Sequence, residues 1–357
     1  MANTCLEFKN ICMEFPGVKA LSDVSFAINT GETHALMGAN GAGKSTLIKI
    51  LARVYQQTSG DVILNGENLN KVTPGNIRDH GIEFIFQELE LVPGFTVAQN
   101  IMIGIEPRKG GMVDWKKMNE FAQKALDDFM PGVVDATESI DNLSVAKQQL
   151  VCIVRALSRN PKILVLDEPT SRLSATETEA LFEAIRRVRT RQEITIIYIS
   201  HRLEELFKIC DCVTILRDGV YTGTWPLSEM TQEDIVYRMV GQVKKSGEHL
   251  PPNPEMLAKK SIFDVEHLNL PGVIEDVSFH VRPGEILALT GAVGAKKTEI
   301  FETIMGIRPG GTGTVRINGQ EAKISGPRSA KNHGICLIPE DRRKNGIIQD
   351  RNNKRKL

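Results

Sequence analysis

Hydrophobic and polar residues alternate in two stretches near the start of the chain, residues 6–12 and 24–28. This period of two is typical of strands with one buried face, and a proline and a glycine between the stretches predict a turn. Residues 32–37 form a short, mostly apolar run that predicts a buried strand, and residues 46–55 carry apolar side chains at helical spacing. The chain is therefore expected to begin with antiparallel strands and to continue into a strand followed by a helix.

Strand and helix patterns alternate through the middle of the chain. Further strands are expected at residues 60–64, 81–86, 162–166 and 194–199, and helices at residues 97–104, 114–129, 144–157 and 177–189. Asn65-Gly66 follows the first of these strands and is a strong hairpin signal. Because alternating strands and helices favour a parallel sheet covered by helices, we expect an α/β fold.

The sequence also repeats itself at a fixed distance. Residues 276–279 have the same Asp-Val-Ser-Phe sequence as residues 23–26. The other matched positions are Gly31-Glu32 with Gly284-Glu285, Gly38 with Gly291, Gly60 with Gly313, Asn65-Gly66 with Asn318-Gly319, and Gly81-Ile82 with Gly334-Ile335. Subtracting 38 from 291 gives 253, and every pair keeps this offset. A constant offset over so many positions predicts two homologous domains.

This repeat defines the expected domain organisation. We expect a first domain at residues 1–243, a linker at residues 244–260, the N-terminal part of a second domain at residues 261–342 and a polar tail at residues 343–357. The linker is rich in proline and poor in large apolar residues. The second domain is expected to be incomplete, because the counterparts of Ser144, Asp167 and His201 would fall at positions 397, 420 and 454, beyond residue 357.

The sequence GANGAGKS at residues 38–45 is typical of a phosphate-binding loop. Glycines let the main chain approach an anion closely, and the N-terminus of the following helix adds about half a positive elementary charge. The candidate phosphate-binding residues are Gly38, Asn40, Gly41, Ala42, Gly43, Lys44, Ser45 and Thr46. A chance match in a glycine-rich turn is the alternative, and the predicted strand before the loop and helix after it argue against that. The loop is thus expected to lie in the predicted α/β fold, between a buried strand and a helix.

Two carboxylates, Asp167 and Glu168, follow the apolar run at residues 163–166. In a parallel sheet, a strand end of this kind lies beside a phosphate loop on a neighbouring strand. Asp167 is then expected to ligate Mg²⁺ together with Ser45, and Glu168 to orient or deprotonate an attacking water. The alternative is a solvated helix N-cap before Pro169-Thr170, which the presence of the phosphate loop makes less attractive.

Charge, apolar runs and cysteine spacing argue against several classes of protein. The 44 basic and 44 acidic side chains cancel, so the overall charge does not suggest a protein that binds nucleic acid or anionic membranes. The N-terminus lacks a signal-peptide pattern and no apolar run is long enough to span a bilayer, so we expect a cytoplasmic, soluble protein. The six cysteines show no C-x-x-C spacing, from which we expect reduced thiols and no zinc.

The order of these motifs resembles that of the ATP-binding-cassette ATPases, and specifically the tandem-cassette ATPase subunits of bacterial sugar importers of the ribose, galactose and xylose type. The resemblance implies an α/β fold, a P-loop NTPase core with an antiparallel β subdomain and a helical subdomain, followed by a partial repeat of the same domain. It also implies ATP and Mg²⁺ as cofactors and assigns roles to individual residues. Gln87 matches the family's Q-loop, residues 143–149 (LSVAKQQ) match its signature, His201 matches its switch histidine, and Phe15 falls where the family stacks a ring on adenine. Gln87 could instead be a turn residue, His201 a structural histidine and Phe15 a core residue.

The resemblance also implies partners and a location. Such subunits energise membrane-spanning permeases that receive sugar from a binding protein, so the chain would lie on the inner face of the cell membrane. In this family ATP is held between two cassettes, and the signature, here beginning at Ser144, faces the nucleotide of the opposite cassette. The resemblance therefore implies dimerisation of cassettes, for which a second chain can supply the partner, and no nucleic acid is expected.

Some residues differ from the family pattern, and these differences suggest alternative functions for the chain. Lys147 is unusual within the signature, Lys296 replaces the glycine equivalent to Gly43 in the second loop, and Glu340 stands in place of Gln87. The second nucleotide site is therefore expected to be degenerate, and the chain to be a truncated form of the tandem subunit. One alternative is a non-hydrolysing nucleotide-binding remnant. A soluble tandem-cassette translation or repair factor is disfavoured, since the linker is short and bears prolines.

Overall fold

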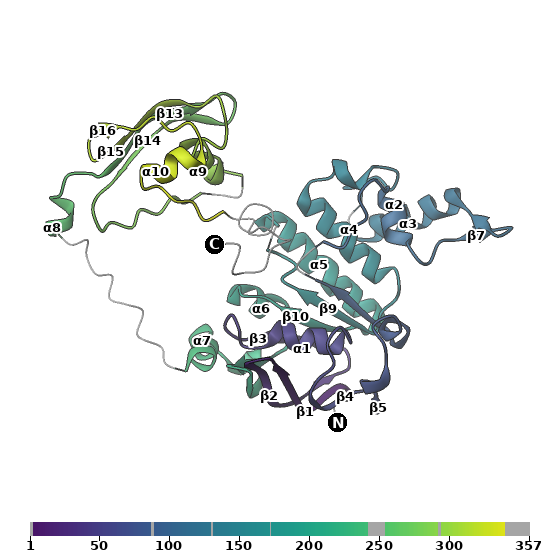
Figure 1. Cartoon of the computed structure of the whole chain (residues 1–357). Helices are drawn as coiled ribbons and strands as arrows, with labels where there is room; N and C mark the ends of the chain where they lie inside the picture. The colour runs from purple at the N-terminus through teal and green to yellow at the C-terminus, as the bar shows by residue number, and fades with distance from the viewer. Residues whose placement is uncertain are drawn as a thin grey trace. The chain divides into compact units, whose positions relative to one another are not determined.

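The computed structural model describes residues 3–86, 89–129, 131–171, 173–241, 254–291 and 294–339. The chain divides into two compact units, Met1–Lys244 and Lys245–Leu357, and each is described by itself (Figure 1). Among the described residues, no helix combines the length and the apolar character needed to cross a lipid bilayer.

The first unit is organised on a ten-stranded sheet in the order β5-β4-β1-β2-β12-β11-β3-β10-β9-β6. Its strands are β1 (Thr4–Phe15), β2 (Val18–Asn29), β3 (Thr33–Met37), β4 (Ser59–Leu64), β5 (Glu67–Asn68), β6 (Ile82–Ile85), β9 (Ile163–Asp167), β10 (Thr195–Ile199), β11 (Cys212–Arg217) and β12 (Val220–Pro226). Strands β1, β2, β4 and β5 pair antiparallel, which agrees with the alternation at the start of the sequence. The β11–β12 hairpin was not predicted; its Asp218-Gly219 turn is the sequence signal for it.

The five strands β11, β3, β10, β9 and β6 pair in parallel. Every residue of β3 and β10 is buried, as expected for strands that are covered on both faces. Because these strands run in the same direction, their carboxyl ends lie at one edge of the sheet. The phosphate loop follows β3 at that edge, the acidic pair ends β9, and His201 follows β10.

Alpha-helices accompany the strands of the first unit. They are α1 (Lys44–Leu51), α2 (Val97–Met102), α3 (Trp115–Phe129), α4 (Val145–Leu157), α5 (Ala175–Gln192), α6 (Leu203–Ile209) and α7 (Gln232–Val240). Short 3-10 helices lie at Leu69–Lys71, Ile77–His80, Ile140–Asn142 and Leu227–Glu229, and a small hairpin is formed by β7 (Arg108–Lys109) and β8 (Met112–Val113). The sequence patterns predicted α1 to α5 to within a few residues at each end.

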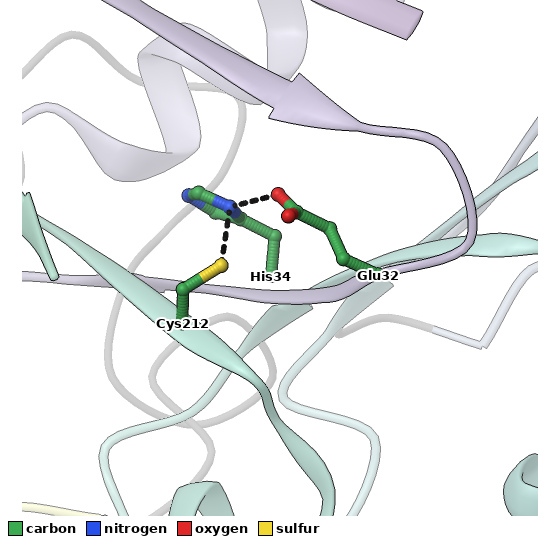
Figure 2. A group of neighbouring side chains, drawn as sticks. All are labelled: Glu32, His34 and Cys212. Atoms are coloured by element: carbon green, nitrogen blue, oxygen red, sulfur yellow. Dashed lines mark hydrogen bonds and ion pairs between the residues drawn. The ribbon is translucent and has the colours of Figure 1, made fainter. Parts of the chain in front are cut away.

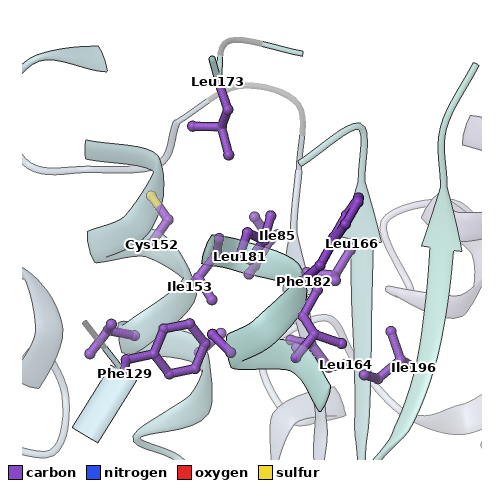
Figure 3. Close-up of a cluster of buried hydrophobic side chains, with 14 of the residues drawn as sticks. Ile85, Phe129, Cys152, Ile153, Leu164, Leu166, Leu173, Leu181, Phe182 and Ile196 are labelled. Carbon is purple, nitrogen blue, oxygen red and sulfur yellow. The ribbon is translucent and has the colours of Figure 1, made fainter. Parts of the chain in front are cut away.

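The sheet separates two hydrophobic cores. Side chains of α1 pack with those of β1 on one side, whereas α4 and α5 pack on the other. Figure 3 shows the second core, where Ile153 and Phe182 of the helices meet Leu164 of β9 and Ile196 of β10. Phe182 is fully buried, and burial of a side chain of this size stabilises a fold by about 1.5–3 kcal/mol.

The second unit repeats the beginning of the first. Its strands β13 (Phe263–Leu270), β14 (Ile274–Val281), β15 (Thr312–Ile317) and β16 (Gln320–Glu321) form an antiparallel sheet, and its helices are α8 (Pro254–Leu257), α9 (Lys297–Ile304) and α10 (Pro327–Asn332). Strands β15 and β16 and helix α9 lie 253 residues after β4, β5 and α1 at both ends. The repeated residues therefore form matching elements.

One repeated segment does not match. Residues 286–290 correspond to β3, yet they form no strand in the described part of the second unit. Ile286 is 96% exposed, whereas its counterpart Thr33 is fully buried. A parallel strand needs neighbours for its backbone groups, and no counterpart of β10 or β11 is present among the described residues of this unit.

Candidate functional site

The phosphate loop connects β3 to α1, as predicted. Gly41 and Gly43 have φ angles of +85° and +96°, a backbone conformation that favours glycine. A Cβ atom at Gly43 would also lie 2.5 Å from Leu21 Cδ2 and 2.9 Å from the Ala20 carbonyl oxygen. Conformation and space therefore both require glycine at this position, which ends the loop where α1 begins.

The other loop residues differ in exposure. Asn40, Gly41 and Ser45 are exposed and Thr46 is half-buried, whereas Gly38 and Ala42 are buried. The buried Ala42 donates its backbone N–H to the Ala39 carbonyl, 3.1 Å away, which closes the turn. Ser45 is thus exposed to solvent, while the buried residues Gly38 and Ala42 fix the backbone of the loop.

Lys44 is the cation of the site. Its ammonium group donates to the carbonyl oxygens of Gly38, at 2.6 Å, and Ala39, at 3.1 Å, so the side chain folds back over the loop. Burial lowers the pKa of Lys44, and the negative charges of Glu168 and Asp167 oppose that effect. The lysine therefore lies within electrostatic reach of both carboxylates.

Asp167 and Glu168 meet the loop at the carboxyl edge of the sheet. Asp167 ends β9 opposite Ile199 of β10, and the Glu168 N–H donates to the Ile199 carbonyl at 2.8 Å. Glu168 has a φ of +51°, a conformation that is uncommon outside glycine and is found at turns and functional sites. Burial, and secondly the charge of Glu168, raise the pKa of Asp167 to about 6, while Lys44 opposes the rise. Burial is therefore the main cause of this shift, and the neighbouring carboxylate adds to it.

We expect Asp167→Asn to stabilise the protein in the absence of nucleotide and divalent cations, and the gain to depend on pH. The pKa of Asp167 in the folded chain, about 6, lies above its ordinary value of 3.8, so the folded state binds more protons between these values. The contribution of Asp167 to stability therefore falls as pH rises from about 4 to about 6. Thermal unfolding should give the largest difference between variant and wild type at pH 7–8 and little difference near pH 4. A gain that is equal at every pH would contradict this account.

His201 completes the group. It follows β10, and its Nδ1 lies 3.2 Å from Glu168 Oε1. The His201 side chain is 64% exposed, so it can be reached by a ligand from solvent. The structure thus brings together Lys44, Asp167, Glu168 and His201, from three separate strand ends, as the parallel sheet predicted.

Glu205 of α6 is a site-adjacent residue that the motif search did not single out. Its side chain is buried, and its carboxylate accepts hydrogen bonds from Thr170 Oγ1 at 2.8 Å, Tyr198 OH at 2.7 Å and Ser200 Oγ at 2.9 Å. Thr170 lies two residues after Glu168, and Ser200 immediately precedes His201. Glu205 therefore links the segment after the acidic pair to the segment that carries the histidine.

Two other predicted site residues contact residues outside this group, and a third lies outside the described part. Phe15 ends β1, is half-buried, and packs against Tyr55 with ring centroids 5.4 Å apart. Ser144 is exposed and caps α4, where its hydroxyl accepts the Lys147 N–H at 3.3 Å. Gln87 lies outside the described residues, so its predicted role is untested.

The loop of the second unit has the same lysine geometry. Lys297 Nζ donates to the Gly291 carbonyl at 2.6 Å, as Lys44 does to Gly38. Lys296, which replaces the glycine equivalent to Gly43, has a φ of +62°. For a residue with a Cβ atom this conformation costs about 1–2 kcal/mol. Glu340, Ala292 and Val293 lie outside the described residues.

Comparison with known proteins agrees with the motif order. A family model described as ABC transporter matches residues 21–171 and 274–355, two segments that begin 253 residues apart. The putative ribose/galactose/methyl galactoside import ATP-binding protein 1 of Agrobacterium fabrum is 43% identical over 343 residues, which cover 96% of this chain and 67% of the relative. The xylose import ATP-binding protein XylG of Brucella abortus is 40% identical, covering 98% of this chain and 69% of the relative.

Solved structures share the fold of the first unit. A nucleotide-free ATP-binding cassette from an ABC transporter has a TM-score of 0.56 at 24% identity and covers 68% of this chain and 96% of that structure. An ATP-binding cassette of an ABC transporter in its ADP conformation has a TM-score of 0.55 at 26% identity and covers 66% and 94%, respectively. Matches over nearly the whole chain and over both repeated segments show that this chain belongs to the ABC transporter family.

Proposed function

We propose that the chain is the ATP-binding and ATP-hydrolysing subunit of a carbohydrate import complex. The observation that carries this proposal is the meeting of Lys44, Asp167, Glu168 and His201 at one edge of the parallel sheet. The names of its relatives, which import ribose, galactose, methyl galactoside or xylose, support carbohydrate as the class of cargo.

The donors of the site fit Mg·ATP. Lys44 and the backbone N–H groups from Gly38 to Thr46 suit the phosphates, and oxygen ligands such as Ser45 and Asp167 are those that Mg²⁺ prefers. Gln87 is proposed as a further ligand. Phe15, half-buried at the end of β1, offers a ring face for adenine. A bound cation would also relieve the repulsion that raises the pKa of Asp167.

Hydrolysis is assigned to Glu168 and His201. Glu168 directly follows β9, at the edge of the sheet where the phosphate loop also lies, and it can orient a water or accept its proton. His201, 3.2 Å from Glu168, can hold that carboxylate in place and donate a hydrogen bond to the terminal phosphate. Bound Mg²⁺ supplies neutralisation of phosphate charge; proton transfer and orientation are left to these two side chains and Gln87.

The signature at Ser144 is proposed to act on the nucleotide of another cassette. Ser144 and Val145 are exposed at the N-terminus of α4, a helix of 13 residues whose dipole favours an anion. Two copies of this chain can therefore provide the signature to each other's nucleotide site.

We expect the rate of ATP hydrolysis per chain to rise with protein concentration. A Ser144→Arg chain retains its own loop and acidic pair but lacks a working signature, and a Lys44→Ala chain has the opposite defect. Each variant alone should be nearly inactive, while a mixture of the two should regain activity because one complete site forms per mixed pair. Phosphate release, measured alongside light scattering, tests this. Full turnover at dilutions where the wild type is a monomer would contradict the proposal.

The second loop is proposed to be a degenerate site that binds nucleotide weakly, because Lys296 occupies a strained glycine position. The proposed partners are membrane-spanning permease subunits and a sugar-binding protein, which places the chain on the inner face of the membrane. A subunit that binds ATP without hydrolysing it is the competing function. Restoration of sugar uptake in a strain that lacks the matching ATPase would support an active subunit; ATP binding without uptake or turnover would favour the competing function.

A further inference from the structure

Glu32, His34 and Cys212 form a cluster at the amino ends of β3 and β11 (Figure 2). His34 lies opposite Cys212 in the parallel pairing of these strands. His34 Nδ1 is 2.8 Å from Glu32 Oε1 and 3.4 Å from Cys212 Sγ, and the three ligand atoms all lie within 4.8 Å of one another. A carboxylate, an imidazole and a thiol therefore converge on one point. A single hydrogen on His34 Nδ1 cannot make a good hydrogen bond to the carboxylate and to the sulfur at the same time.

The ring of His34 is held in the orientation that this convergence needs. Its Nε2 lies 2.7 Å from Thr214 Oγ1, and the ring stacks on Phe26 with centroids 5.8 Å apart. Thr214 Oγ1 is in turn 2.7 Å from Thr224 Oγ1, which accepts a hydrogen bond from Tyr221 OH. Histidines that bind metals usually donate their second ring N–H to a fixed oxygen in this way.

We infer that Glu32, His34 and Cys212 bind a divalent transition-metal ion of the Zn²⁺ class. Zinc bonds of about 2.0–2.3 Å place tetrahedral ligand atoms about 3.3–3.6 Å apart. The separation of His34 Nδ1 from Cys212 Sγ, 3.4 Å, already has this value, whereas the 2.8 Å between His34 Nδ1 and Glu32 Oε1 must widen by roughly half an ångström. Asp211 is not the fourth ligand, because its oxygens accept the Thr33 N–H at 2.8 Å and pair with Arg189 at 2.7 Å. Water then fills the fourth position.

The charges of the site suit such an ion. Burial, together with the negative charge of Glu32, raises the pKa of the Cys212 thiol to about 12, so without a metal the thiol keeps its proton at neutral pH. On binding, the S–H bond breaks, the sulfur–metal bond forms, and that proton leaves to solvent. The imidazole proton moves from Nδ1 to Nε2 and is donated to Thr214. One thiolate and one carboxylate neutralise a divalent cation, so the negative charge of Glu32 no longer opposes ionisation of the thiol.

This site differs from the proposed nucleotide site. Gly38, where the phosphate loop starts, lies four residues after His34, about 13 Å along an extended strand. A thiol and an imidazole are poor ligands for Mg²⁺, which selects oxygen. A metal here would join β3 to β11 below the loop. The chain positions of the ligands, 32, 34 and 212, explain why the absence of C-x-x-C spacing gave no sign of it.

The test is metal binding by the full chain in excess Mg²⁺. The affinity for Zn²⁺ is measured by competition with a chromophoric chelator, and Co²⁺ serves as a spectroscopic probe of the ligands. We expect one ion per chain, release of one proton, a thiolate-to-Co²⁺ charge-transfer band, and a higher unfolding temperature in Zn²⁺. Cys212→Ser should weaken Zn²⁺ binding at least tenfold and abolish the band, and Glu32→Gln should weaken binding while keeping the band.

Cys336→Ser is the matched control, since Cys336 is an exposed thiol in the second unit. It should leave the affinity, the band and the gain in unfolding temperature unchanged. Circular dichroism establishes that the variants are folded. The inference is overturned if folded wild type fails to bind Zn²⁺, if Cys212→Ser binds as the wild type does, or if Cys336→Ser removes binding. In those cases the cluster is a hydrogen-bonded part of the core alone.

Discussion

Replacing Glu168 with glutamine is expected to reduce ATP hydrolysis by roughly 10²- to 10⁴-fold while leaving ATP bound. Glutamine keeps the shape of the side chain and its place beside His201 but cannot accept a proton. Lys44 and Asp167, which are proposed to hold the nucleotide and its Mg²⁺, are unchanged. Binding of a fluorescent ATP analogue and single-turnover phosphate release, measured on the same preparation, separate the two effects.

Lys44→Ala provides the opposite pattern. This substitution removes the cation that folds over the loop, so binding of the ATP analogue should be lost together with turnover. The pair of variants therefore distinguishes a chemical role from a binding role within one site. Turnover in the Glu168→Gln protein at the wild-type rate would remove Glu168 from the mechanism, and equal loss of binding in both variants would make its role structural.

The convergence of the candidate site residues was predictable because each of them follows or ends a strongly patterned strand. The apolar runs before Asp167 and His201 predict buried parallel strands, and parallel strands place their carboxyl ends at one edge. Proximity of Lys44, Asp167, Glu168 and His201 follows from that topology without knowledge of any side-chain contact. The loop glycines were predictable for a similar reason, since a phosphate loop needs backbone conformations that other residues adopt only with strain.

Contacts made across the fold were beyond such patterns. Cys212 reaches His34 through the pairing of β11 with β3, and neither residue is marked by its neighbours in sequence. Residues 286–290 show the opposite case, in which a sequence pattern predicts a strand that does not form. That segment has the apolar pattern of β3, but among the described residues of the second unit it has no parallel neighbours with which to form a ladder. The apolar pattern of a segment indicates its preference for the β conformation, but pairing with neighbouring strands decides whether a strand forms.

Glu205 was overlooked because an acidic residue on an amphipathic helix is usually exposed. Its neighbour Glu204 is exposed, and only packing of α6 against the sheet turns Glu205 inward. There it accepts hydrogen bonds from Thr170, Tyr198 and Ser200. Burial of a carboxylate is costly unless several donors satisfy it, so this residue has a defined task in the fold. The task indicated by its partners is to fix the segments on both sides of the Glu168–His201 pair.

Glu205→Ala is therefore expected to reduce kcat by roughly 10²-fold, because misplacement of a catalytic group by about 1 Å has an effect of that size. It should also lower the free energy of unfolding by about 1–3 kcal/mol, since buried hydroxyl groups lose their acceptor. Binding of ATP should change little, because the hydrogen bonds of Glu205 go to Thr170, Tyr198, Ser200 and Arg202 and not to Lys44. Steady-state kinetics and chemical denaturation measure these quantities.

A conservative variant and a neighbouring control separate positioning from loss of stability. Glu205→Gln retains one oxygen acceptor and should recover part of kcat, whereas Glu204→Gln, at the exposed adjacent position, should behave as wild type in both assays. Because Ser200 Oγ also accepts the Arg202 N–H at 3.0 Å, the backbone on both sides of His201 depends on this hydroxyl. A fall in stability with unchanged kcat would assign Glu205 to the core alone. A fall in kcat that Glu205→Gln partly reverses makes it a positioning residue for hydrolysis.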